Sequence, residues 1–243
     1  MVIINNFLHY FRIPDNNNVM GGKSSVFDMI GPVMIGPSSS HTAGVVRIGR
    51  AARNIFGEQP ETVIITFYNS FARTYEGHGS DRAIVAGLLD FNTDDERIKT
   101  ALDIAATKEM EVRYKSVGNA STMHPNTVAV EMVKDKKKMK IVGESRGGGV
   151  IQITNINGFD AGFSTALYTL IITADDVKGS IAFMANVLSQ ADCNIASMTV
   201  SRKGKHDLAC QIIEMDSAVN DVTLNYLSSL SFIDNIIYLP KML

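Results

Sequence analysis

Four hydroxyl side chains and one imidazole occupy five consecutive positions, a combination able to bind a small anion and to move a proton. They are Ser38, Ser39, Ser40, His41 and Thr42. Gly36 and Pro37 interrupt the backbone before this run, and apolar residues recur after it at helical spacing, at positions 45, 48, 52 and 55. The run is therefore expected at a helix N-terminus, where the dipole alone favours a carboxylate by about 0.3–1 kcal/mol. Because capping needs only one hydroxyl, from Ser39 or Ser40, we predict a ligand site.

The role of His41 stays open between two kinds of chemistry and one structural alternative. An unperturbed imidazole has a pKa near 6.5, so it could carry a proton or orient a substrate. An imidazole that only fixes the loop, by a hydrogen bond to a backbone carbonyl, is the competing interpretation.

His78 lies between Gly77 and Gly79, which let the backbone approach a ligand closely. Asp81 could cap the helix that follows or fix the imidazole, and we interpret it as part of the loop structure. His78 is predicted to form part of the wall of the site.

His124 stands before Pro125, which favours extended backbone at position 124. Asn126 is expected to cap a turn. Nothing in the spacing alone decides whether His124 binds a substrate.

The composition is that of a globular protein whose ligands are small molecules and proteins. The chain has 243 residues, 45% of them hydrophobic and 20% charged, with a formal net charge of -2. This charge gives no reason to expect nucleic acid or an anionic membrane as a partner. No apolar run reaches the roughly 18 residues of a membrane span, and residues 1–11 do not resemble a secretory signal, so a cytoplasmic protein is expected. Met20 is a candidate start, and we assign no function to residues 1–19.

Cysteine usage limits the metal chemistry that this chain could perform alone. Cys193 and Cys210 are the two cysteines of the sequence, and sixteen residues separate them. Iron–sulfur clusters commonly take four thiolates. We therefore expect no metal site in this chain, and predict that both thiols are small buried side chains.

Residues 25–156 show the pattern of an α/β domain with a mostly antiparallel sheet. A strand could cover residues 33–35 before the Gly-Pro break. Strands are expected at 61–68, 111–117, 127–133, 139–143 and 150–155, and helices at 81–89 and 94–108. The charged run at 134–138 is interpreted as a hairpin tip and Gly147-Gly148-Gly149 as a hairpin or a close backbone approach, since neither phosphate-loop spacing fits.

Residues 157–164, with two glycines, have the composition of an inter-domain linker. The remainder predicts strand 167–173, helix 179–190, strands 195–202 and 207–213, helix 219–227 and strand 233–239. This βαββαβ order is the ferredoxin-like arrangement. An α+β protein of two domains, 25–156 and 166–243, is therefore expected.

Arg47, Arg50 and Arg53 recur every third position on the helix after the hydroxyl run. The simplest interpretation is a solvated helix face. A docking surface for a partner chain is the alternative.

Three ordered motifs resemble one known family, the beta chains of bacterial iron–sulfur-dependent L-serine dehydratases. The Gly36–Thr42 stretch GPSSSHT is similar to their signature, and GHGSDRA at 77–83 resembles their Gly-His-Gly-Thr-Asp element with Ser80 in place of threonine. HPNT at 124–127 is similar to a third element, and SVFDMIGP at 25–32 to the family's opening. Residues 175–181 resemble the ligand loop of ACT domains, the regulatory modules that bind amino acids, with Lys178 where proline is common.

This resemblance implies an activity that two chains share. An alpha subunit would supply a [4Fe-4S] cluster, and together the chains would convert L-serine to pyruvate and ammonia. It implies His41 and His78 as catalytic residues and Ser38, Ser39, Ser40, Thr42 and His124 as substrate-binding residues. The second half would be an ACT domain able to take an amino-acid effector. The alternative is a regulatory subunit that senses amino acids without catalytic residues, since the first half is also similar to a domain of some phosphoglycerate dehydrogenases.

Overall fold

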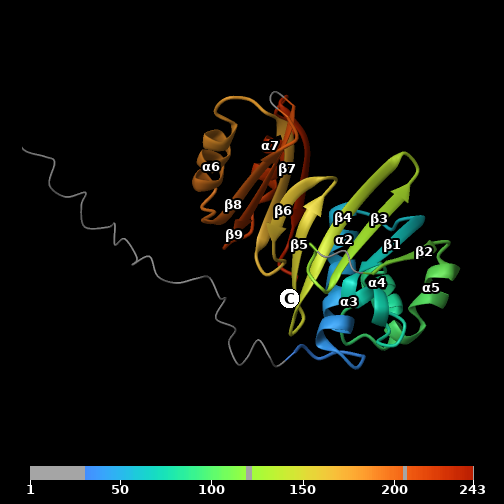
Figure 1. Ribbon diagram of the computed structural model, residues 1–243. Helices are drawn as coiled ribbons and strands as arrows, with labels where there is room; N and C mark the ends of the chain where they lie inside the picture. Colours follow the sequence, from blue (N-terminus) through green and yellow to red (C-terminus); the bar gives the residue numbers. More distant parts are fainter. Residues whose placement is uncertain (1–30, 119–121, 205–206, 243) are drawn as a thin grey trace, which may run out of the picture.

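The computed structural model describes residues 31–118, 122–204 and 207–242, which form two β-sheets with helices packed on them (Figure 1). The fold is α+β, as predicted. The motif at 25–32 lies outside the described residues except for its last two positions.

The first sheet has six strands in the order β2-β1-β3-β4-β5-β6. Neighbouring strands are antiparallel except for β1 and β2, which run parallel, so the prediction of a mostly antiparallel sheet is confirmed. The parallel pair requires a crossover, which the helices between β1 and β2 provide. The strands are β1 (Thr62–Tyr68), β2 (Glu111–Val117), β3 (Thr127–Lys134), β4 (Lys137–Gly147), β5 (Val150–Ile156) and β6 (Phe159–Phe163).

Six helical segments of the described residues accompany this sheet. They are η1 (Ser39–Ala43), α2 (Gly44–Phe56), α3 (Asn69–Thr74), α4 (Ser80–Leu88), η2 (Glu96–Thr100) and α5 (Ala101–Thr107). The apolar positions that predicted α2 are buried against the sheet, among them Val45, Ile48 and Ile55. Helices α2 and α4 cross closely, because a Cβ atom at Gly49 would lie 2.4 Å from the Ile84 carbonyl oxygen.

The structure differs from the sequence expectations in three places. Residues 33–35 form no strand; instead the backbone N–H of Ile35 donates to the Thr93 carbonyl at 2.8 Å. The expected helix at 94–108 begins at Glu96 and its first part is a 3-10 helix, because Asp95 caps it through the N–H of Arg97. Helix α3 was not predicted, and its start depends on a distant contact, the Ser70 N–H donating to the Pro125 carbonyl at 2.9 Å.

The second sheet has four antiparallel strands in the order β10-β7-β9-β8, with two helices. Its elements are β7 (Tyr168–Asp175), α6 (Ser180–Gln190), β8 (Ile195–Arg202), β9 (Leu208–Met215), α7 (Asp221–Ser228) and β10 (Ile233–Leu239). This sequence of elements and this strand order confirm the ferredoxin-like arrangement.

The two sheets share apolar packing, and the predicted linker is part of it. Residues alternate along a strand, so Leu170 and Ile172 face α6 and α7 while Ile171 joins the core of the first sheet. Residues 157–164 were expected to be a linker, which was wrong, because β6 within them pairs with β5 and contacts β8 and β9. Figure 1 shows β6, the edge strand of the first sheet, next to the second sheet, and α6 on the outer side of the second sheet.

Two hairpin predictions are confirmed. The charged run turns at Asp135 between β3 and β4, and the glycine run turns between β4 and β5. Across the described ranges, no helix is long and apolar enough to cross a bilayer.

Candidate functional site

The hydroxyl run folds into a compact polar turn at the start of the long helix. Ser38 caps η1, since its Oγ accepts from the His41 N–H at 3.1 Å, so the predicted cap at Ser39 or Ser40 was one or two residues too late. The Ser40 Oγ lies 3.0 Å from His41 Nδ1 and 3.2 Å from the Ser38 Oγ. This turn is a π-helix, and π-bulges occur frequently at functional sites. Ser38, Ser40 and His41 therefore form one hydrogen-bonded group, which we call the hydroxyl cluster.

The imidazole of His41 has one nitrogen held by serine and one without a partner. Nε2 is buried and has no hydrogen bond to any residue in the described parts of the chain. Phe71 meets the ring edge-on at 5.0 Å between centroids, and the His78 ring lies 4.8 Å away. The two histidines that the motifs singled out thus lie side by side, although 37 positions separate them in the chain.

Burial lowers the pKa of His41 below its usual 6.5, because the charged imidazolium loses hydration, and the neighbouring His78 lowers it further. The neutral imidazole of His41 is therefore favoured at pH 7. The proton it holds sits on one nitrogen only: if Nδ1 donates to Ser40, Nε2 presents a lone pair, and if Ser40 donates to Nδ1, Nε2 presents its N–H.

Two hydrogen bonds connect the hydroxyl run to the loop of His78. The Thr42 Oγ1 donates to the His78 carbonyl at 3.3 Å, and the Ser80 Oγ donates to the His41 carbonyl at 2.6 Å. Ser80 is fully buried at the start of α4. The hydroxyl at position 80 therefore has a structural role in joining the two motif loops.

A cavity of about 270 Å³ opens beside these loops. Thr42 and His78 line it, with Arg82 and Lys99 bringing positive charge and Glu76 negative charge. Ser38, Ser39 and Ser40 are not among its lining residues. Of the predicted site residues, Ser38, Ser40 and His41 thus form the hydroxyl cluster and Thr42 and His78 line the cavity, while Ser39 does neither.

His124 lies at the same end of the sheet, but it belongs neither to the hydroxyl cluster nor to the lining of the cavity. Its Nδ1 accepts from the Asn126 N–H at 3.2 Å, and its carbonyl accepts from the Thr127 Oγ1 at 2.7 Å. Burial and then Arg146 lower the pKa of His124, while Glu144 opposes them. These bonds close the turn before β3. The substrate-binding role of His124 stays a prediction, as do those of the other motif residues.

Two residues next to the cluster carried no signal in the sequence. Phe71 packs on His41 from α3, a helix that was not predicted. Ser145 on β4 is fully buried, its Oγ has no partner among the described residues, and a Cβ atom at Gly44 would lie 2.2 Å from that oxygen. Only the fold brings either residue to η1.

The described residues do not fit an iron–sulfur cluster. They contain no group of three or more histidine, cysteine or acidic side chains placed to hold a metal ion. Cys193 and Cys210 are both buried, as predicted; burial raises the pKa of Cys210 to about 11, so that thiol is protonated. Cys193 lies in the loop between α6 and β8 and Cys210 lies on β9, so both are far in sequence from the hydroxyl cluster.

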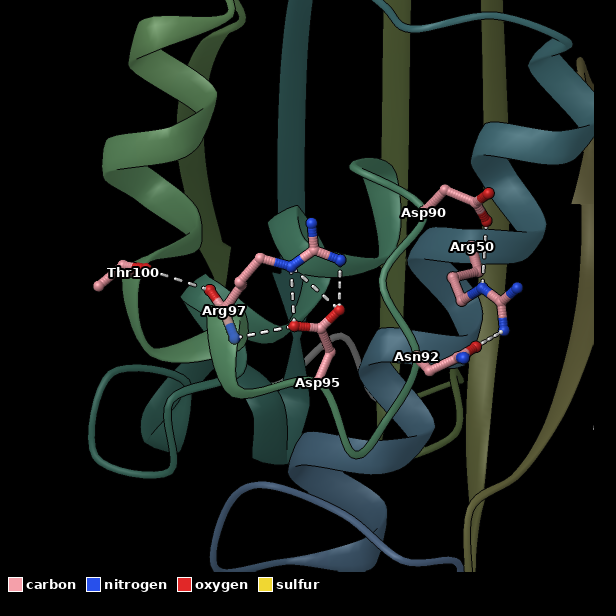
Figure 2. A network of polar contacts seen from close by, with 6 residues as sticks. All are labelled: Arg50, Asp90, Asn92, Asp95, Arg97 and Thr100. Carbon is pink, nitrogen blue, oxygen red and sulfur yellow. Dashed lines mark hydrogen bonds and ion pairs between the residues drawn. The ribbon is translucent and has the colours of Figure 1, made fainter.

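The arginines after the hydroxyl run are not a simple solvated face. The Arg47 Nη1 donates to the Gly149 carbonyl at 2.8 Å, which places the glycine hairpin against α2. Arg50 binds Asp90 and Asn92 (Figure 2). Intramolecular contacts thus occupy two of the three arginines.

Fold and site together define an α+β protein of two sheets with a polar site at a helix start. Residues 25–155 match the family described as serine dehydratase beta chain. A probable L-serine dehydratase beta chain of Bacillus subtilis (strain 168) is 48% identical over 217 residues, 89% of this chain and 97% of that protein. An L-serine dehydratase beta chain of Peptoniphilus asaccharolyticus is 32% identical over 198 residues, 81% and 89% of the two chains. This chain belongs to the serine dehydratase beta chain family.

A more distant similarity concerns a different enzyme. A D-3-phosphoglycerate dehydrogenase of Bacillus subtilis (strain 168) is 22% identical over 187 residues, 75% of this chain and 35% of that protein.

Proposed function

We propose that this chain is the beta subunit of an iron–sulfur L-serine dehydratase, a cytoplasmic lyase that converts L-serine to pyruvate and ammonia. In this proposal an alpha subunit supplies the [4Fe-4S] cluster. Membership of the beta chain family supports the reaction, and the two buried, separate thiols of this chain support a cluster that belongs to the partner.

The residues of this chain would bind the amino acid and manage one proton. In this proposal the hydroxyls of Ser38, Ser39, Ser40 and Thr42 would donate to the substrate carboxylate, Thr42 by turning its proton away from the His78 carbonyl. A hydrogen bond to a charged group is worth about 1.5–3 kcal/mol. The neighbouring start of a helix favours the same charge. Removal of the α-proton requires an unprotonated base close to the bound substrate.

The observation that carries the proposal is the state of His41. Its Nδ1 is held by Ser40, its Nε2 is buried without a partner in the described chain, and its pKa is lowered by burial. With Nδ1 as the donor, Nε2 is a neutral acceptor fixed in direction. We propose that Nε2 takes the α-proton, and that His78 limits the space in which the imidazole moves.

The proposal is tested with the chain alone and with its alpha subunit. The purified chain is expected to release no pyruvate from L-serine, and the reconstituted pair is expected to release it. In the pair, His41→Ala should lower kcat by about 100-fold or more, the usual contribution of a general base. Arg113→Gln, which breaks an exposed ion pair with Glu111 on the edge strand β2, is the control and should leave kcat unchanged. Serine deamination by the chain alone would contradict the proposal.

Two observations favour a second function, the sensing of amino acids. The similarity to a phosphoglycerate dehydrogenase covers most of this chain, and the second half has a ferredoxin-like topology resembling an ACT domain. The chain could then be a subunit that senses amino acids. Near-normal turnover of His41→Ala, with a changed response to added amino acids, would favour this function over the catalytic one.

A further inference from the structure

We propose that Arg50 is a positioning residue for the hydroxyl cluster, an inference that rests on the proposed function. It acts through residues 90–95, which join α4 to η2 and which we call the strap. The strap holds the backbone that leads into Ser38. None of the sequence motifs includes the strap.

Arg50 fixes the strap with two hydrogen bonds from one guanidinium. Its Nε donates to the Asp90 Oδ1 at 3.2 Å, and its Nη1 donates to the Asn92 Oδ1 at 2.5 Å (Figure 2). The planar fork of arginine suits two acceptors at a set separation, which an ammonium group cannot reproduce. Because Arg50 lies on α2, the strap is attached to the same helix that the hydroxyl run begins.

Arg97 fixes the other end of the strap. The Arg97 Nη2 pairs with the Asp95 Oδ2 at 2.6 Å, and the Arg97 guanidinium lies 4.0 Å from the centroid of the Phe91 ring. Figure 2 shows the two arginines on opposite ends of the strap, each pointing to its acceptors. The strap is therefore a braced loop.

Thr93, in the middle of the strap, holds the segment that precedes the hydroxyl run. The Ile35 N–H donates to the Thr93 carbonyl at 2.8 Å, and the Thr93 Oγ1 donates to the Val33 carbonyl at 2.8 Å. Val33 is 81% exposed, so apolar burial contributes little to holding this segment. These two hydrogen bonds fix the backbone on both sides of Met34.

Gly36 and Pro37, which follow Ile35, connect the fixed segment to Thr42 and to the cavity. Gly36 has a φ of +133°, and a Cβ atom there would lie 2.4 Å from the Thr42 Cγ2, so its backbone packs directly on Thr42. Thr42 in turn donates to the His78 carbonyl. Ile35, Gly36 and Pro37 also line the cavity, together with Ile98 and Lys99, which follow the strap. A strap that moves would change both the cavity and the loop of His78.

Amide hydrogen exchange of the isolated chain tests the first half of this inference without any assay of turnover. Arg50→Gln should speed exchange at the Ile35 amide by about tenfold, because the strap that accepts its hydrogen bond loses its anchor. Arg50→Lys should give a smaller increase, since it keeps the charge but not the fork. Thr93→Val removes only the bond to Val33, and it serves as the second variant if Arg50→Gln does not fold. Arg113→Gln is the matched control and should change nothing at Ile35.

Kinetics of the reconstituted pair test the second half. Arg50→Gln and Thr93→Val should each raise KM for L-serine by about fivefold, and together by little more than either alone, because both act through one set of contacts. Unchanged exchange at Ile35 in both variants, or a KM equal to wild type in both, would overturn the inference. If the wild-type pair does not deaminate serine, the proposed function fails, while the exchange result still decides whether Arg50 positions the segment.

Discussion

His41 owes its character to neighbours that are far apart in the sequence. Ser40 is adjacent in the chain, but Phe71 and His78 reach the ring from α3 and from the loop before α4. These contacts remove water from the imidazole and leave Nε2 as its one unused polar atom within the described structure. In this setting the imidazolium cation is disfavoured, and Nε2 is the ring nitrogen left to interact with a ligand.

A titration of the ring tests this account of His41. Because burial and His78 lower its pKa below 6.5, NMR titration should give His41 a lower pKa than an unfolded peptide does. Between the folded pKa of His41 and 6.5, the unfolded chain binds more protons than the folded chain. The contribution of His41 to the free energy of unfolding therefore falls as the pH falls through that range. His41→Gln should weaken the dependence of the unfolding free energy on pH as the pH falls below about 6.5.

A His41 pKa at or above 6.5 would contradict this prediction. His124→Gln provides a comparison, because burial also lowers the pKa of His124 but its Nδ1 closes a turn away from the cluster. The His41 pKa should be the same in that variant as in the wild type.

The sequence indicated a polar helix start but not the contacts within it. The crowding of hydroxyls before a helix indicated a polar helix start, and the motifs singled out His41 and His78, which the fold brings together. The division into a hydroxyl cluster and a cavity was not predicted, because it depends on which way Thr42 and Ser40 point within a π-helical turn. Ser145 could not be predicted at all, since β4 reaches η1 only through the register of the sheet.

At the scale of elements, the crossing of α2 and α4 positions both motif loops. The hydroxyl run begins α2 and the loop of His78 begins α4, so the distance between these helices sets the distance between the loops. Glycines make the close approach possible: a Cβ atom at Gly87 would lie 2.1 Å from the Val46 carbonyl oxygen and 2.7 Å from the Arg50 N. No flexible side chain could move aside there, because the neighbouring atoms belong to the backbone.

Gly87→Ala is therefore expected to destabilise the protein. Forcing extra volume into a packed contact typically costs about 1–3 kcal/mol, which outweighs the gain of about 0.5–1 kcal/mol that alanine gives in a helix. Urea unfolding measures the difference. Gly118→Ala is the control, because a Cβ atom there would meet nothing within 4 Å. Equal stability of Gly87→Ala and the wild type would show that the helices can separate freely.

Element predictions succeeded where the hydrophobic period was long and failed where contacts between distant segments decide. The apolar positions of α2 and the β-branched run of β1 correctly predicted both. The segment 33–35 was wrongly expected to be a strand, because its partner is the single residue Thr93 rather than a strand. Helix α3 is short and depends on Pro125, so no periodicity could reveal it.

At the scale of the molecule, the two sheets form one packed body. Ile171, Ile212 and Leu239 of the second sheet belong to the same core as Ile156 and Phe159 of the first. The sequence contained a signal for this that the glycines obscured: Phe159, Ala161 and Phe163 alternate with polar or small residues, and all three are buried. Gly158 and Gly162, with φ of +85° and +78°, serve a tight turn and an irregular strand instead of a linker.

A shared core predicts that a substitution that destabilises one sheet also destabilises the other. Ile212 on β9 is 2% exposed and faces the first sheet, so Ile212→Ala should cost about 2–5 kcal/mol, the usual range for such a truncation. Hydrogen exchange should then speed up in β5 and β6 as well as in β9, because both sheets pack on that side chain. Ile181→Ala is the control: Ile181 is 49% exposed on α6, and its truncation should leave exchange in the first sheet unchanged. Faster exchange confined to the second sheet in Ile212→Ala would mean that the two sheets are stable independently, and that an effector on the second could not influence the hydroxyl cluster through this core.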